Sequence, residues 1–116
     1  MTEGRQVTVR FRATNKDIFD AIRTGKKKVE TRAGTKKYIR LVQGDVLVCV
    51  CGKEKLEKKI TKVTHSKTLA GLLKKYRPSA ITPWAKTSKE LEAIYYSFPG
   101  YKEKIKKFGI VAFEIK

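Results

Sequence analysis

The segment around which the chain is organised is Gly25–Arg32, GKKKVETR, which lies where a helical pattern stops at a glycine and an extended pattern begins. It sets Glu30 among lysines and an arginine and contains no apolar run, so it cannot be simple core. On a regular strand Glu30 and Arg32 share one face, whereas Lys27 points to the other. We therefore expect Lys27 to join them only if it lies in the turn that follows Gly25.

This cluster has an electrostatic consequence. Beside Arg32 and Lys27, the carboxylate of Glu30 is expected to stay ionised and to hold the planar guanidinium in place. The ammonium of Lys27 would then stay free to meet a phosphate or carbonyl oxygen. The alternative is a surface Glu–Arg pair beside solvated lysines, which contributes little to stability. The eight residues alone leave both interpretations open.

The residues before this segment predict a strand and a helix. Residues 7–11 alternate between apolar and polar side chains, which is the period of a half-buried strand. Residues 14–24 then change to helical spacing and end at a glycine. Within the segment itself, the β-branched Val29 and Thr31 favour extended backbone.

The residues after it predict further strands. Residues 33–43 suggest a loop or a short irregular strand, and Gly44-Asp45 signals a turn. Residues 46–51 are apolar on both faces, which is typical of a strand inside a closed sheet. Residues 56–65 predict its partner, with a bulge near Ile60 and Thr61 because the apolar positions change parity there.

The last third of the chain predicts two helices and a strand. Residues 68–76 have helical spacing, and residues 77–86 are expected to form a loop because they contain Pro78 and Pro83. Thr87 and Glu90 fit a capping box for a second helix. A short basic turn then precedes a final strand over residues 109–115.

This order of elements predicts an α+β fold. The order differs from the regular βαβα alternation of a parallel sheet, and several strands are apolar on both sides. A small mixed, partly closed β-barrel with flanking helices accommodates such strands best. With 116 residues and 41% hydrophobic side chains, we expect one domain over residues 1–116 with one modest core.

The charge balance indicates a polyanionic partner. Twenty-eight Lys and Arg residues stand against 11 Asp and Glu, for a net charge of +17. Thermophilic surfaces are also rich in lysine, but they tend to gain glutamate with it, and acids are scarce here. A one-signed excess attracts nucleic acid through counterion release. A lipid surface is the second choice; because the two helices predicted in the last third of the chain are needed for the core, we expect no membrane binding.

Other features limit the remaining function classes. Cys49 and Cys51 lie two apart in a predicted strand, where bridging is strained, so we expect reduced thiols. With His65 as the single histidine and no C-x-x-C spacing, a zinc site built from Cys and His is not expected. Metal held by carboxylates stays open, but no motif signals it, so we expect no metal and no cofactor. No apolar run is long enough for a membrane span, and the amino terminus has no secretory signal pattern, which predicts a cytoplasmic protein.

The pattern Gly25-x-Lys27-x-x-Glu30-x-Arg32 resembles the G-x-K-x-x-E-x-R signature of the ASCH domains, which are small PUA-like barrels associated with RNA. The resemblance extends over nearly the whole chain. It includes the Gly44-Asp45 turn before an apolar strand, a leucine-rich helix after a basic strand, and FPG followed by the closing GIVAFEIK. It implies a PUA-like barrel whose motif lies in an RNA-binding cleft.

We expect a protein that binds RNA, as the resemblance implies, with single-stranded DNA or a nucleoside as alternative ligands, and we expect it to be a monomer. The expected nucleic-acid-binding residues are the motif side chains, arginines for the backbone, and two aromatic side chains that could stack a base: Lys27, Glu30, Arg32, Arg10, Arg12, Arg40, Trp84 and Tyr96. Tyr95 fits the apolar stripe of its helix better and is expected in the core.

Two rival functions stay open. One branch of the family hydrolyses acetylated cytidine nucleosides and nuclease activity has been attributed to another, so Lys27 and Glu30 would be the catalytic residues of an amidohydrolase or ribonuclease. The cytidine-hydrolysing branch has threonine where this chain has Glu30, and Glu30 opposes the lowered lysine pKa that catalysis needs. The third possibility is a protein-interaction module whose charge keeps it in solution.

Overall fold

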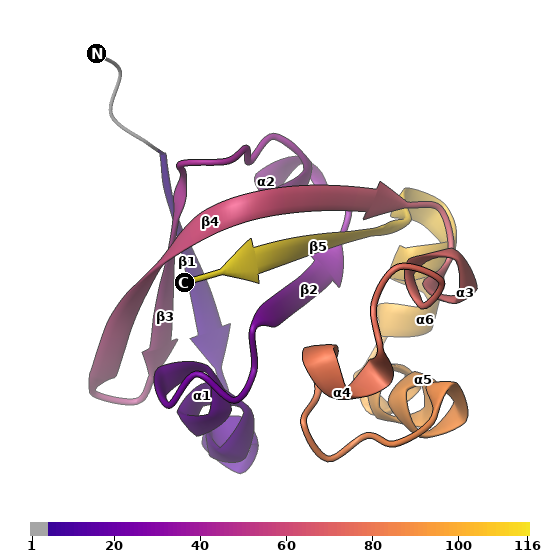
Figure 1. Cartoon of the computed structure of the whole chain (residues 1–116), viewed down its shortest axis with the longest axis horizontal. Helices are drawn as coiled ribbons and strands as arrows, with labels where there is room; N and C mark the ends of the chain where they lie inside the picture. Colours follow the sequence, from indigo (N-terminus) through magenta and orange to yellow (C-terminus); the bar gives the residue numbers. More distant parts are fainter. Residues whose placement is uncertain (1–4) are drawn as a thin grey trace.

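The computed structural model describes residues 5–116, in which a curled mixed sheet forms a partly closed barrel with helices around it (Figure 1). The strands are β1 (Gln6–Phe11), β2 (Val29–Ala33), β3 (Val46–Cys51), β4 (Glu54–Ser66) and β5 (Ile110–Ile115). The helices are the 3-10 turn η1 (Ala13–Asn15), α1 (Lys16–Arg23), α2 (Lys36–Ile39), α3 (Leu69–Leu72), α4 (Pro78–Ile81), α5 (Ser88–Ser97) and α6 (Tyr101–Phe108). The predicted α+β, PUA-like barrel is confirmed.

The strand order places β1 and β2 at the two edges of the sheet. The order is β1-β3-β4-β5-β2, with β1 parallel to β3 and the other pairs antiparallel. Curling of the sheet brings the edge strands toward each other. As a result, the Arg32 guanidinium of β2 lies 5.3 Å from the ring centre of Phe11 at the end of β1. The opening of the barrel therefore lies between two edge strands that do not pair with each other.

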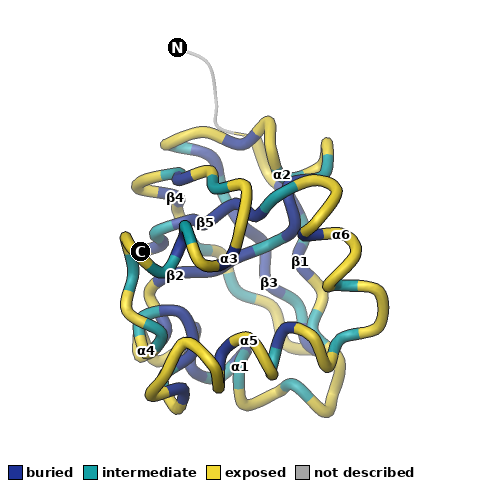
Figure 2. Tube along the Cα trace, turned by 90° about the vertical axis from the view of Figure 1, so that its right-hand side faces the viewer, coloured by how far each residue is buried: buried dark blue, intermediate teal, exposed yellow. Residues whose placement is uncertain are grey.

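Two apolar clusters hold the elements together. One fills the inside of the curled sheet under α1 and includes Phe19, Leu47 and Phe113. The other joins the opposite face of β2 and β5 to the helices α3–α6, which gather at one side of the sheet in Figure 1. Figure 2 shows the buried positions concentrated along the strands, while the outer turns of α4–α6 are exposed. Both faces of β5 are covered, which explains its unbroken apolar sequence.

The expected bulge is confirmed. The pairing of β4 with β5 shifts its register between Ile60 and Lys62. This extra residue compensates for the change of parity, so that Val63 after the bulge packs against the same apolar cluster as Leu56 and Ile60 before it.

Residues 33–43 differ from the expected loop or irregular strand. They contain the one-turn helix α2, and Tyr38 packs its ring 6.5 Å from that of Phe113 while Leu41 is buried. Helical spacing of Tyr38 and Leu41 is what places both side chains toward the sheet, and four residues are too few for that period to be evident in the sequence.

The expected loop over residues 77–86 is also wrong in part. Helix α4 begins at Pro78, since proline suits the first helical position, where no amide donor is needed. The helix expected over residues 68–76 is shorter than its apolar pattern: α3 is capped by Thr68, which accepts a hydrogen bond from the amide of Gly71, and gives way to turns after Leu72.

The predicted capping box before α5 is confirmed with one change. The Thr87 hydroxyl accepts a hydrogen bond from the Glu90 amide, but the Glu90 carboxylate accepts from the amide of Lys86, one residue before the cap. The expected basic turn over residues 101–108 is the helix α6 instead, which starts after Gly100 in a left-handed conformation with φ of 72° and buries Ile105.

Cys49 and Cys51 are both free and buried, in agreement with the expected reduced thiols. Among residues 5–116, no helix has the length and apolar character that crossing a bilayer requires. The first four residues belong to the amino-terminal segment in which we expect no secretory signal, and they lie outside the described residues.

Candidate functional site

A cavity of about 230 Å³ lies at the opening between the edge strands β1 and β2. Its walls come from the end of β1, the start of α1, the middle of β2, the end of α5 and the start of α6. The lining residues are Arg10, Phe11, Arg12, Asn15, Ile18, Lys27, Glu30, Thr31, Arg32, Thr82, Ile94, Tyr95, Phe98, Pro99 and Tyr101. Segments that are far apart in the sequence thus meet the Gly25–Arg32 segment here.

Lys27 lies in the turn before β2, as expected for a side chain that meets Glu30. Gly25 has a φ of 82°, and the Lys27 amide then donates to the carbonyl of Ala21 at 2.9 Å, which holds the turn against the end of α1. The buried Lys27 ammonium donates to the carbonyl of Val29 at 2.8 Å and to that of Ile81. The expectation that this ammonium stays free is therefore wrong, because it ties β2 to α4.

Glu30 is buried, and its two carboxylate oxygens have different surroundings. Oε1 accepts a hydrogen bond from the Thr31 amide at 2.8 Å and lies 3.9 Å from Lys27 Nζ. Oε2 lies 3.7 Å from Nη2 of Arg32 and has no hydrogen-bond partner among the described residues. One oxygen is thus part of the structure, and the other stays open as an acceptor.

Part of this arrangement closes the free edge of β2. Because β2 pairs only with β5, the outward amides of alternate residues need other partners. The Glu30 carboxylate accepts a hydrogen bond from the Thr31 amide, and the Tyr101 hydroxyl accepts one from the Ala33 amide at 2.9 Å. The Lys27 ammonium donates to the carbonyl of Val29. Side chains of the motif therefore replace a neighbouring strand.

Arg32 lies between aromatic rings at the barrel opening. Its guanidinium carbon is 5.3 Å from the ring centre of Phe11 and 5.9 Å from that of Tyr38, both within cation–π range. The Nε atom is buried and has no hydrogen-bond partner in residues 5–116. Stacking and the Glu30 carboxylate fix the guanidinium, while one of its donors stays unused.

The charges of the three motif residues influence one another strongly. Burial lowers the pKa of Lys27, and the field of Glu30 opposes this shift. Burial alone would also lower the pKa of Arg32, but the negative field of Glu30, with smaller contributions from Tyr38, Tyr101 and Cys49, raises it. Arg32 is therefore the firmly charged cation of the cavity.

Two tyrosines form the wall opposite β2. The rings of Tyr95 and Tyr101 stack with centres 5.8 Å apart, and the hydroxyl of Tyr95 shares a hydrogen bond with that of Thr31. Burial raises the pKa of Tyr101 to about 12 and raises that of Tyr95 as well. Both hydroxyls therefore stay protonated and polar at neutral pH, and Tyr95 belongs to the core, as expected, while one edge faces the cavity.

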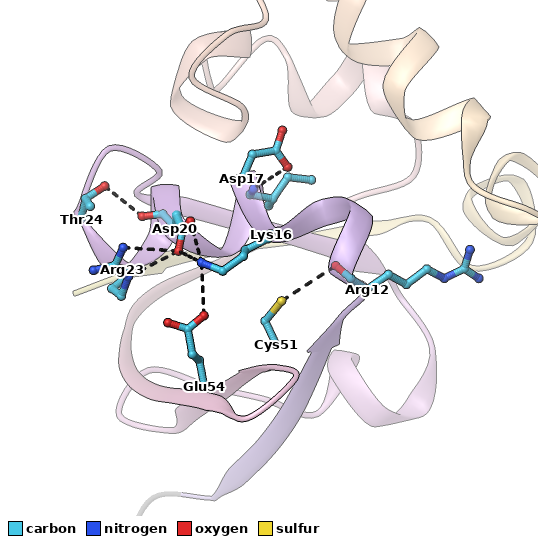
Figure 3. A network of polar contacts seen from close by, with 9 residues as sticks. Arg12, Lys16, Asp17, Asp20, Arg23, Thr24, Cys51 and Glu54 are labelled. Carbon is cyan, nitrogen blue, oxygen red and sulfur yellow. Dashed lines mark hydrogen bonds and ion pairs between the residues drawn. The ribbon is translucent and has the colours of Figure 1, made fainter.

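Arg10 and Arg12 are exposed at the mouth of the cavity, and within residues 5–116 neither forms an ion pair with a carboxylate. Carboxylates near α1 form ion pairs with other cations, since Lys16 contacts both Asp20 and Glu54 (Figure 3). In that view the Arg12 side chain extends away from the network, to which it contributes only its backbone carbonyl. Two cations are thus available where the cavity meets solvent.

The other predicted residues lie away from this cavity. Arg40 is exposed at the end of α2, and the ring of Tyr96 lies 5.3 Å from the ammonium of Lys102. Trp84 is 44% exposed beside Asp17 and other residues of a second, more open hollow next to α1. The structure therefore brings together five of the eight residues expected at the site, and the roles of Arg40, Trp84 and Tyr96 remain predictions.

Sequence reasoning missed most of the aromatic wall. Phe11 looks like an ordinary strand residue, and Phe98 and Tyr101 flank a Pro-Gly turn. Their meeting depends on the curl of the sheet and on α6, which was not expected. The one available signal was the FPGY sequence at residues 98–101, where two aromatic residues enclose a turn and so lie close together.

Comparison with known proteins gives one family and similar solved structures. The family model of the ASCH domain matches residues 13–116. The crystal structure of hypothetical protein PH0355 is 25% identical and superposes with a TM-score of 0.78, covering 95% of this chain and 98% of that one. The solution NMR structure of protein PF0455 from Pyrococcus furiosus is 26% identical with a TM-score of 0.72, covering 96% of each chain. Among curated proteins, no sequence matches significantly.

Proposed function

The chain belongs to the ASCH domain family, and on that premise we propose that it binds single-stranded RNA at the cavity between β1 and β2. The observation that carries the proposal is the position of the buried Glu30–Arg32 pair in an aromatic-walled cavity, with two arginines at its mouth that form no ion pair within residues 5–116. Buried polar groups recognise bases, and exposed cations hold the phosphates between them.

The charge distribution supports a polyanion as the partner. Of the ion pairs in residues 5–116, those outside the cavity lie on or beside α1, so most of the 28 cationic residues have no carboxylate partner there. Phosphates that meet Arg10 and Arg12 would release condensed counterions, which makes binding favourable at low salt. The remaining lysines add attraction without choosing a sequence.

The size of the cavity favours a single strand over a duplex. A hollow of about 230 Å³ holds a small planar group, and Lys27, Glu30 and Thr31 in its lining are buried. The edges of paired bases in an RNA duplex are turned inward or lie in grooves, whereas an unpaired base can be turned out. A duplex would therefore reach the rim arginines and leave the buried pair unused.

Binding accounts for the geometry better than hydrolysis does. A catalytic Lys27 needs a free amine that faces the substrate. Here the buried amine is bonded to the carbonyls of Val29 and Ile81. A lowered pKa of Lys27 is the one feature that hydrolysis would share, and it follows from burial.

The test is a titration of labelled single-stranded RNA followed by fluorescence anisotropy at several salt concentrations. We expect affinity to fall steeply with salt, and Arg12→Gln to lower the slope of log affinity against log salt by about one. Lys74→Gln removes the same charge from an exposed position outside the cavity and is the matched control. Equal losses in both variants, or no RNA binding by the parent protein, would contradict the proposal.

A further inference from the structure

Two polar atoms at the cavity are buried without hydrogen-bond partners among the described residues: Oε2 of Glu30 and Nε of Arg32. The side chain of Glu30 is only 6% exposed. Buried polar atoms are nearly always paired in native proteins, so open ones beside a cavity are available to a group that enters it. The Lys27 ammonium and Oε1 of Glu30, by contrast, are bonded to backbone groups.

These two atoms need different kinds of hydrogen-bond partner, a donor for Oε2 and an acceptor for the Nε–H group. A carboxylate oxygen only accepts hydrogen bonds, and Nε–H of arginine only donates. Both belong to one ion pair, in which Oε2 lies 3.7 Å from Nη2 of the same guanidinium. A ligand that satisfies both must therefore carry a donor next to an acceptor on one edge.

This requirement separates ligand classes. A phosphate could accept from Arg32, but its negative charge would be repelled by Glu30. An ammonium group or metal cation could meet Glu30, but not the guanidinium. A neutral planar ring with an N–H beside a carbonyl or ring nitrogen meets both, and nucleobase edges have this pattern.

The walls of the cavity fit such a ring. Phe11, Tyr95, Phe98 and Tyr101 line it, and aromatic side chains are the usual surfaces on which splayed bases stack. Its volume of about 230 Å³ is below the range of about 300–1,000 Å³ for sites of drug-sized ligands, so one ring system is the appropriate size.

We propose that the cavity takes one nucleobase turned out of an RNA strand, with the base edge donating to Oε2 of Glu30 and accepting from Nε of Arg32. This inference rests on the proposed RNA binding and specifies what enters the cavity. Arg10 and Arg12 then meet the phosphates on either side of the extruded nucleotide, because they lie at the mouth.

Methylation of the base edge tests this arrangement without altering the protein. The probes are short single-stranded homopolymers in matched pairs, unmodified and methylated so that the edge N–H is lost. Oligouridylate and oligoinosinate are each compared with a form methylated at the imino nitrogen of the base. Oligocytidylate and oligoadenylate are each compared with a form in which the exocyclic amine is dimethylated. Charge, backbone and ring stay the same within each pair, so electrostatic attraction does not change.

We expect methylation to weaken binding at least about tenfold in one or more pairs, because a carboxylate acceptor then stays unpaired. Glu30→Gln should lessen that penalty, since the amide of glutamine can turn its donor toward the ligand. Its folding is checked by circular dichroism, and the comparison of ligands on the parent protein does not depend on it.

The outcomes distinguish the inference from the function on which it rests. If all pairs bind within about twofold of each other while affinity stays high and salt-dependent, RNA binding holds and the base pocket is refuted. If no RNA binds, the proposed function fails. Free nucleosides form the last arm: a nucleoside that binds as tightly as the matching strand, with the same sensitivity to methylation, supports the pocket and refutes the strand as its ligand.

Discussion

Replacing Lys27 with methionine removes the ammonium that joins β2 to α4 and keeps the length and most of the volume of the side chain. Two carbonyls, those of Val29 and Ile81, then lose their buried donor. Hydrogen bonds to charged groups contribute about 1.5–3 kcal/mol each, which gives roughly 3–6 kcal/mol for the two. The protein no longer has to bury a charge, and this gain offsets part of the loss. We therefore expect a net destabilisation of about 2–4 kcal/mol.

Urea unfolding at neutral pH, followed by circular dichroism, measures this difference. Given slopes of about 1–3 kcal/mol per molar urea for small proteins, the midpoint should fall by roughly 0.7–4 M. Lys28→Met is the matched control, because its side chain is exposed next in the sequence and the same change should leave the midpoint nearly unchanged. A Lys27→Met protein as stable as the parent would refute the structural role of this lysine.

Three further predictions concern the walls and the core of the barrel. Tyr95→Phe removes a buried hydroxyl bonded to β2 and should cost about 1 kcal/mol in thermal unfolding, whereas Tyr96→Phe at the exposed neighbour should cost nothing measurable. Burial, with the field of the Glu30 carboxylate, raises the pKa of the Cys49 thiol from 9.0 to about 12. Between these pH values the folded state keeps a proton that the unfolded state loses, so the free energy of unfolding should decline as pH rises from 9 to 12. Cys49→Ala should make that decline shallower by up to about 1.4 kcal/mol per pH unit, and an unchanged slope would show that this thiol is not responsible. Phe98→Ala should weaken RNA binding about tenfold through lost stacking, while Trp84→Ala, outside the cavity, should leave it within about twofold; the reverse order would place the stacking surface at the second hollow.

The strands could be predicted because each has a local cause. The alternation in residues 7–11, the two-sided apolar run of residues 46–51 and the parity change at Ile60 are properties of a few neighbouring side chains. The short helices α2 and α4 were missed because their pattern covers a single turn, and α6 because its lysines obscured the apolar stripe through Ile105. In each of these cases packing against a distant element stabilises the helix.

The candidate site was predictable only as far as its motif. The turn after Gly25 and the shared face of Glu30 and Arg32 follow from local geometry, and both are observed. The partners of Lys27 depend on α4, more than fifty residues later in the chain, as the hydrogen bond to Ile81 shows. No local pattern contains that information, so the sequence suggested a free ammonium where the structure has a buried one.

Arginine side chains offer the most direct test of the base-binding cavity, because the Nε–H group of Arg32 gives its own signal in a nitrogen–proton NMR spectrum. The group has no hydrogen-bond partner among residues 5–116, so a bound base edge should change its environment strongly. During titration with short single-stranded RNA, we expect this signal to shift with the same affinity that anisotropy gives, and Arg32→Lys identifies it by its loss. RNA that binds with full affinity while the Arg32 signal stays unchanged would contradict the account.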